Sequence, residues 1–80
     1  MFFVYVLKSI EFDYRYVGFT TELDRRLQEH NKGRTRSSKR YRPFEIIYFE
    51  EVKTREETRK REKYFESAAG RLFLKKKLAP

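Results

Sequence analysis

The run FFVYVLK at residues 2–8 restricts the fold more than any other part of the sequence. It is dense in aromatic and β-branched residues and far shorter than a membrane span, which favours a buried strand. Residues 14–19, YRYVGF, resume this character after a turn at residues 10–13. The two segments therefore predict an antiparallel hairpin. We expect Gly18 to end the second strand and to permit close approach of a backbone or ligand.

The rest of the chain predicts a helix, a third strand and two further helices. Thr21 is the expected N-cap of the first helix, and Gly33 can take the left-handed conformation after its end. Residues 44–51 read as the third strand. The second helix begins with a capping box formed by Thr54 and Glu57, and it runs to about residue 66. Residues 67–70 break the chain before a short helix over 71–78.

We expect Leu72, Phe73 and Leu78 to fix that last helix to the core. The order strand, strand, helix, strand, helix, helix predicts an α+β fold: a three-stranded, largely antiparallel sheet flanked by about three helices. Eighty residues form one domain. The core depends on aromatic side chains, because the chain has no cysteine and therefore no disulfide or thiolate metal site. We expect a cytoplasmic protein without a secretory signal or membrane span.

Positive charge is concentrated in one segment. The net charge is +8, and residues 32–43 carry six basic side chains and no acid. These are Lys32, Arg34, Arg36, Lys39, Arg40 and Arg42, with a second cluster at residues 75–77. The pattern predicts a polyanionic partner, with nucleic acid first and an anionic membrane second. The alternative is a solubilising surface.

Two helix positions carry polar residues where the apolar stripe should run. Arg26 and His30 follow Leu23 by three and seven residues, so they lie on or beside the buried face of the first helix. Glu62 lies four residues after Thr58 in the second helix and is expected to point inward. Read alone, His30 could equally be solvated or cap the helix, and Glu62 could be an ordinary paired acid.

Val4-Tyr5-Val6, Tyr16-Val17-Gly18, Arg26, His30 and Glu62 together resemble the ordered motifs of the GIY-YIG nuclease family, and most closely its small stand-alone bacterial members. The resemblance covers nearly the whole chain. It implies metal-assisted hydrolysis of phosphodiester bonds, with DNA as the expected substrate ahead of RNA. The alternative is a catalytically weak or inactive nucleic-acid-binding module within a repair or recombination complex.

The resemblance also implies a role for each residue of the set. Glu62 would hold one divalent cation, Mg²⁺ or Mn²⁺, and Tyr16 would act as general base. Tyr5 would hydrogen-bond the attacking water or Tyr16. Arg26 would contact the scissile phosphate, and His30 would orient the site or share proton transfer. Without the family, both tyrosines would read as ordinary strand aromatics.

Nucleic-acid contacts are expected from Arg25 and from the six basic residues of segment 32–43, and they would position the backbone without reading sequence. Tyr41 could stack on an unpaired base or pack against the protein. The sequence departs from the family at two places. No asparagine lies about twelve residues after Glu62, and Phe19 stands where the excision-repair branch has a lysine.

Overall fold

The computed structural model describes residues 1–78 and has the predicted α+β architecture. Its elements are β1 (Phe2–Ser9), β2 (Arg15–Thr20), α1 (Leu23–Asn31), a 3₁₀ turn (Lys39–Tyr41), β3 (Phe44–Val52), α2 (Arg55–Glu66) and α3 (Ala68–Leu78). The expected order of strands and helices is confirmed. β2 continues two residues beyond Gly18, so this glycine does not end the strand.

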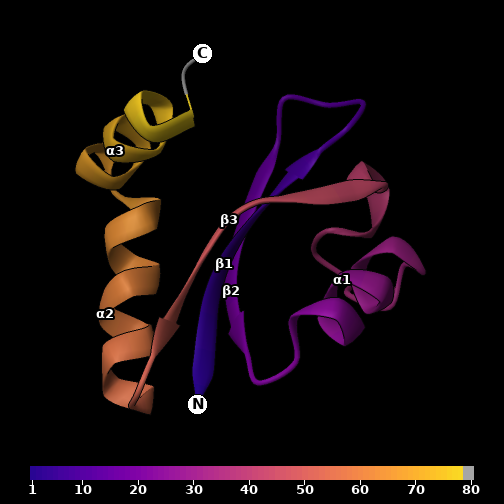
Figure 1. Cartoon of the computed structure of the whole chain (residues 1–80). Helices are drawn as coiled ribbons and strands as arrows, with labels where there is room; N and C mark the ends of the chain where they lie inside the picture. The colour runs from indigo at the N-terminus through magenta and orange to yellow at the C-terminus, as the bar shows by residue number, and fades with distance from the viewer. Residues whose placement is uncertain (79–80) are drawn as a thin grey trace.

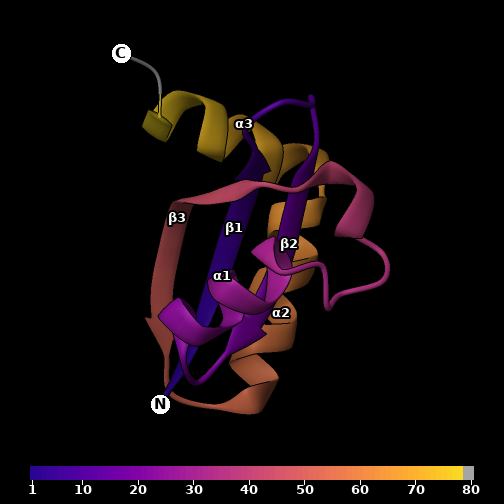
Figure 2. The ribbon, with the colours of Figure 1, turned by 90° about the vertical axis from the view of Figure 1, so that its right-hand side faces the viewer.

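The three strands form an antiparallel sheet in the order β2-β1-β3. The most apolar strand, β1, lies in the centre, where Tyr5 pairs with Gly18 on one side and with Phe49 on the other. Helix α1 covers one face of the sheet, and α2 and α3 cover the other face (Figure 1). Seen from the α1 side, the sheet lies between α1 in front and α2 behind (Figure 2).

Alternation along β1 divides the core into two halves, because successive side chains of a strand point to opposite faces. Val4 and Val6 pack towards α2 and α3, in a cluster that includes Phe65. Tyr5 and Leu7 belong to a second cluster on the α1 face. Tyr5, one of the predicted site residues, therefore lies inside an apolar layer.

The caps of the first two helices differ from expectation in one place. Glu22, and not Thr21, is the N-cap of α1, and it makes no side-chain cap. The preceding turn is instead held by Thr20, whose Oγ1 accepts a hydrogen bond from the Glu22 N–H at 3.1 Å. Gly33 has φ +79°, as predicted for the residue after the helix. The Thr54 cap is confirmed, because its Oγ1 accepts from the backbone N–H of Glu57 at 3.1 Å.

Helix α3 begins at Ala68, so the break before it is shorter than predicted. Ser67 caps the new helix through its Oγ, which accepts from the Gly70 N–H at 3.2 Å. Gly70 allows α3 to start tightly against α2, because a Cβ there would lie 1.9 Å from the carbonyl oxygen of Tyr64. In the helix that follows, Leu74 lies in the core and Phe73 packs against it.

The expected attachment of α3 is therefore only partly correct. Phe73 packs against the core as predicted. Leu72 and Leu78 are 53% and 41% exposed, whereas Leu74 is 1% exposed and holds the helix in their place.

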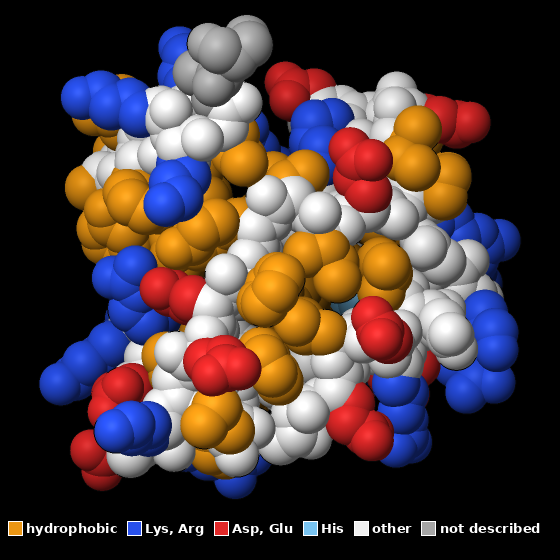
Figure 3. Space-filling view, viewed as in Figure 1, with side chains coloured by type: hydrophobic (Ala, Val, Ile, Leu, Met, Phe, Trp, Pro, Cys, Tyr) orange, Lys and Arg blue, Asp and Glu red, His pale blue; other side chains and the backbone are white. Residues whose placement is uncertain are grey.

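β3 forms the outer edge of the sheet and carries apolar side chains that no helix covers fully. In Figure 3 hydrophobic side chains gather over this strand, with acidic side chains at their border. Phe49 is 52% exposed and packs edge-on against Phe3. Within residues 1–78, every helix is too short or too polar to cross a membrane.

Candidate active site

Four of the five predicted catalytic residues meet on the α1 face of the sheet. Tyr5 comes from β1, Tyr16 from β2, and Arg26 and His30 from α1. The Tyr5 hydroxyl lies 3.1 Å from His30 Nε2, and Arg26 Nε lies 3.3 Å from the same hydroxyl. The Tyr16 ring lies 4.6 Å from the His30 ring and 6.4 Å from the Tyr5 ring, between centroids. Residues that are 25 positions apart in sequence thus form one cluster.

Gly18 provides the space in which the two phenols meet. A Cβ at this position would lie 2.7 Å from the Tyr5 hydroxyl oxygen and 3.0 Å from Cε1 of Tyr16. Real Cβ atoms do not approach other atoms so closely, so any side chain here would displace the tyrosines. The predicted close approach is therefore real, although the neighbours are side chains instead of a backbone or ligand.

The hydrogen bonds of the cluster run in one direction. The Tyr5 oxygen accepts from Arg26, which can only donate. The Ser38 hydroxyl gives its proton to the Thr35 carbonyl, so it accepts from His30 Nδ1, and Nε2 is left to accept the Tyr5 proton. His30 therefore carries its proton on Nδ1, which donates to Ser38 Oγ at 2.9 Å. The Ser38 hydroxyl in turn donates to the Thr35 carbonyl at 3.5 Å. The tautomer follows from this network.

Ser38 was not predicted, and no local signal marks it within a basic segment. It is fully buried and connects the cluster to that segment.

Burial fixes the protonation states of the inner residues. Desolvation raises the pKa of Tyr5 to about 12, against the lowering effect of its hydrogen bond from Arg26. Burial, with the neighbouring charge of Arg26, lowers the pKa of His30 to about 4. At neutral pH Tyr5 is therefore a neutral phenol and His30 a neutral imidazole. His30 is 0% exposed, so the solvated interpretation is wrong.

The Arg26 guanidinium remains charged. Burial alone would lower the pKa of Arg26, but hydrogen bonds to Tyr5 and Glu29 and the neighbouring phenols raise it overall. Its Nη1 donates to Glu29 Oε1 at 3.0 Å, and its side chain is 33% exposed. Within residues 1–78 its Nη2 group has no hydrogen-bond partner, which leaves it able to bind an anion.

Tyr16 is the outer phenol of the pair. It is only half-buried, whereas Tyr5 is 2% exposed, and the Tyr5 hydroxyl bonds to His30 and Arg26 instead of Tyr16. Tyr16 also lines a cleft of about 920 Å³ between β2 and the α2–α3 pair, together with Glu66 and other residues. Of the two phenols, Tyr16 is therefore the one that water and substrate can reach.

Glu62 comes from α2, in the layer on the other face of the sheet from α1. It is half-buried, and burial and the charge of Glu66 raise its pKa, against the lowering effect of Arg59. Its negative charge is one of the causes that raise the pKa of Tyr5, so it lies within electrostatic range of the cluster. No hydrogen bond or ion pair joins Glu62 to Tyr16 or to any other side chain in the described part of the chain.

The residues around Glu62 fit only a sparsely coordinated cation. Among residues 1–78 no three acidic or histidine side chains come together as a metal site. A single carboxylate suits Mg²⁺, which keeps several water ligands and takes phosphate oxygens from its substrate. The position twelve residues after Glu62 is Leu74, which packs in the core. Apolar burial thus fixes α3 where the family often has an asparagine.

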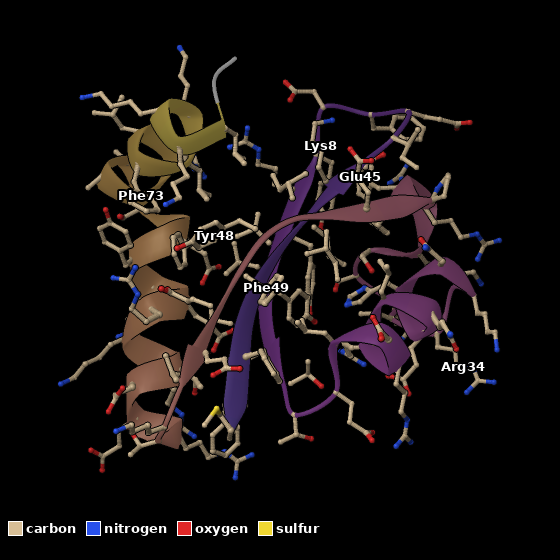
Figure 4. All side chains as sticks on the ribbon, viewed as in Figure 1. Lys8, Arg34, Glu45, Tyr48, Phe49 and Phe73 are labelled. Carbon is tan, nitrogen blue, oxygen red and sulfur yellow. The ribbon has the colours of Figure 1, made fainter. Side chains whose placement is uncertain are left out.

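The predicted nucleic-acid residues are all exposed. Arg25 forms surface ion pairs with Glu22 and Glu29. Within residues 1–78 the six cations of segment 32–43 form no ion pair, and Arg34 points outward from this segment (Figure 4). The lysines at residues 75–77 lie on α3, in the opposite layer of the molecule.

Comparison with known proteins agrees with this geometry. The family model described as "GIY-YIG catalytic domain" matches residues 1–76. A UPF0213 protein of Listeria welshimeri is 45% identical over 64 residues, which cover 79% of this chain and 70% of the relative. UPF0213 protein YazA of Bacillus subtilis is 36% identical over 64 residues, which cover 79% of this chain and 64% of that protein. No solved structure gives a significant match. The match over residues 1–76 shows that the chain belongs to the GIY-YIG family of nuclease domains.

Proposed function

We propose that this protein is a divalent-metal-dependent endonuclease that hydrolyses phosphodiester bonds of DNA in the cytoplasm. The observation that carries the proposal is the directed hydrogen-bond chain from Arg26 through Tyr5 to His30. It holds a charged guanidinium, one phenol and an imidazole in a fixed arrangement, and the Tyr16 ring packs against this imidazole. Each buried polar side-chain atom of residues 1–78 has a hydrogen-bond partner, so the cluster is stable. Apolar side chains of the same shape would hold the fold about as well, so the polar set favours a role in chemistry.

The roles follow from exposure and protonation. Tyr16 acts as general base, because it is the more exposed of the two phenols and belongs to a residue that borders the cleft. Tyr5 and His30 position the site. At neutral pH the Tyr5 phenol keeps its proton and the His30 imidazole carries no charge, so neither group changes its protonation state. Arg26 donates its free Nη2 group to the scissile phosphate and stabilises the charge that develops there.

Glu62 is the residue that holds the metal. Its half-buried carboxylate lacks an ion-pair partner within residues 1–78, so a cation can compensate its unfavourable burial. When bound, Mg²⁺ or Mn²⁺ supplies electrostatic stabilisation of the leaving oxygen.

The test is a nicking assay on supercoiled and branched DNA with Mg²⁺ or Mn²⁺. The wild type should cut, and a chelator should stop cutting. Glu62→Gln should abolish cutting and leave DNA binding intact. The matched control is Glu56→Gln in the exposed first turn of the same helix, which should cut at the wild-type rate. Cutting by Glu62→Gln at the wild-type rate would show that the metal assignment is wrong.

The second candidate function is a binding module within a repair or recombination complex. The exposed cations of segment 32–43 favour it, because they can hold DNA without any chemistry. A wild type that binds every tested DNA and cuts none of them would establish this alternative.

A further inference from the structure

The tip of the β1–β2 hairpin and the basic segment form a second surface, separate from the catalytic cluster. A pocket of about 450 Å³ is lined by Glu11, Phe12, Arg36, Lys39, Arg40 and Arg42. Its lining thus combines four cations with one aromatic ring and one acid. Nothing in the proposed hydrolysis uses this pocket.

Phe12 is the unusual member of the lining. It is 46% exposed, which is a large exposed fraction for a phenylalanine in so small a domain. Its ring packs edge-on against Tyr41, at 5.6 Å between centroids and 86° between planes. Tyr41 in turn lies flat on Tyr14 at 3.9 Å and 9°, and Tyr14 contacts Phe44 in the core. Phe12 is therefore the outermost ring of an aromatic ladder that reaches from the core to the surface.

Tyr41 packs within the protein: its ring stacks on Tyr14, meets Phe12 in an edge-on contact and has the Arg40 guanidinium over it at 5.7 Å. The packing interpretation of Tyr41 is correct. Phe12 is the aromatic residue of this surface that remains open.

The pocket is fixed in place by hydrogen bonds of the backbone. The Phe12 N–H donates to Ser9 Oγ at 2.9 Å, and Lys8 Nζ donates to the Phe12 carbonyl at 2.6 Å. Lys8 lies beside the hairpin turn (Figure 4). The Ile10 N–H donates to the carbonyl of Pro43 at 2.9 Å, which joins the hairpin to the end of the basic segment. The backbone that carries the Phe12 ring is therefore held in place before a ligand arrives, which lowers the cost of ordering this part of the pocket.

We propose that this pocket binds an unpaired nucleotide of the DNA substrate, with the base stacked on Phe12 and the flanking phosphates on Arg36, Lys39, Arg40 and Arg42. Aromatic rings beside a basic groove are how proteins hold single strands. A duplex cannot use the ring, because the faces of its bases are already stacked on one another. Glu11 disfavours a phosphate directly beside Phe12 and leaves that place to an uncharged base.

The inference rests on the proposed function and names its substrate class: DNA that contains a single-stranded element, such as a flap or fork. Stacking on one aromatic side chain contributes about 1–3 kcal/mol per base, which corresponds to roughly 5- to 150-fold in affinity. The duplex would still bind through the basic segment, but without this contribution.

The test measures binding in chelator, so that no cutting occurs, with a labelled single strand, a blunt duplex of the same sequence and a duplex with a flap. Phe12→Ala should weaken binding of the single strand and the flap by roughly 5- to 150-fold and leave the blunt duplex unchanged. Phe12→Tyr should retain wild-type affinity, whereas Phe12→Leu should lose it, because leucine keeps apolar volume without an aromatic face. Phe49→Ala is the matched control, since Phe49 is a similarly exposed phenylalanine on β3 (Figure 4).

Two results would overturn the inference. One is a Phe12→Ala variant that binds the single strand as well as Phe49→Ala does. The other is a Phe12→Leu variant with wild-type affinity, which would show that only apolar packing is needed. Circular dichroism of each variant establishes that it is folded. The binding panel includes no cutting step, so its result is independent of the Glu62→Gln assay.

Discussion

Acid should destabilise this protein through His30 before most carboxylates titrate. His30 is fully buried, and its pKa falls to about 4 in the folded chain from an ordinary value of 6.5. Between these values the unfolded chain binds a proton that the folded chain does not bind. The free energy of unfolding therefore decreases as the pH falls from about 6.5 towards 4, and the effect is absent above this window.

The loss of stability in acid can be calculated from the lowered pKa of His30. One pKa unit corresponds to about 1.4 kcal/mol, so full protonation of His30 costs roughly 3 kcal/mol. A domain of this length has a total stability of about 4–12 kcal/mol. Acid titration of one side chain thus removes a large share of the stability. Two carboxylates also contribute: the lowered pKa of Glu29 adds acid sensitivity below its ordinary range, and the raised pKa of Glu62 opposes it.

The assay has two parts. The ring-proton NMR signal of His30, the single histidine of the chain, reports its pKa in the folded protein without ambiguity. Urea unfolding across the same pH range gives the change in stability, and His30→Gln serves as the control because it keeps the carboxylates. The stability of the wild type should fall more steeply than that of His30→Gln. A histidine that titrates near 6.5, or parallel pH dependence of the two proteins, would refute the argument.

Two further substitutions test the packing. Gly18→Ala should destabilise the fold by about 1–3 kcal/mol and reduce nicking, because the new Cβ would collide with Tyr5. A thermal melt measures the loss of stability, and the nicking assay measures the loss of activity. A variant that melts and cuts like the wild type would contradict the close contact. Leu74→Ala should cost about 2–5 kcal/mol in urea unfolding, whereas Leu72→Ala should change stability by less than about 0.5 kcal/mol. Equal losses in these two variants would show that the buried side of α3 is assigned wrongly.

The architecture could be predicted from the sequence because its signals are local. The strands at residues 2–8 and 44–51 are marked by dense apolar residues, and the Thr54 cap by its own spacing. The start of α3 could not be predicted in this way, because it depends on a contact between Gly70 and the end of α2. A glycine in the sequence reads as a break, whereas here it permits a close helix junction.

In the candidate site, too, the residues with a local sequence signal could be predicted and the others could not. The positions of Arg26 and His30 beside the apolar stripe anticipated that both side chains face the sheet. The role of Ser38 could not be read, since a serine among basic residues has no periodicity to place it. The same is true of Phe12, whose exposure depends on how Tyr41 and Tyr14 stack beneath it. Residues that act across two loops leave no pattern in either loop alone.

The segment between α1 and β3 is closed at its base by one side chain. The Asn31 amide accepts from the Phe44 N–H at 2.6 Å and donates to the Phe44 carbonyl at 3.2 Å, so it ties the last residue of the helix to the first residue of the strand. With both ends held, a change of length between Gly33 and Ser38 adds little closure entropy. Exchange of the exposed cations Arg34 and Arg36 would retune affinity for polyanions, provided that Thr35 and Ser38 are kept. These two residues hold His30 through hydrogen bonds, and with it the geometry around Tyr5.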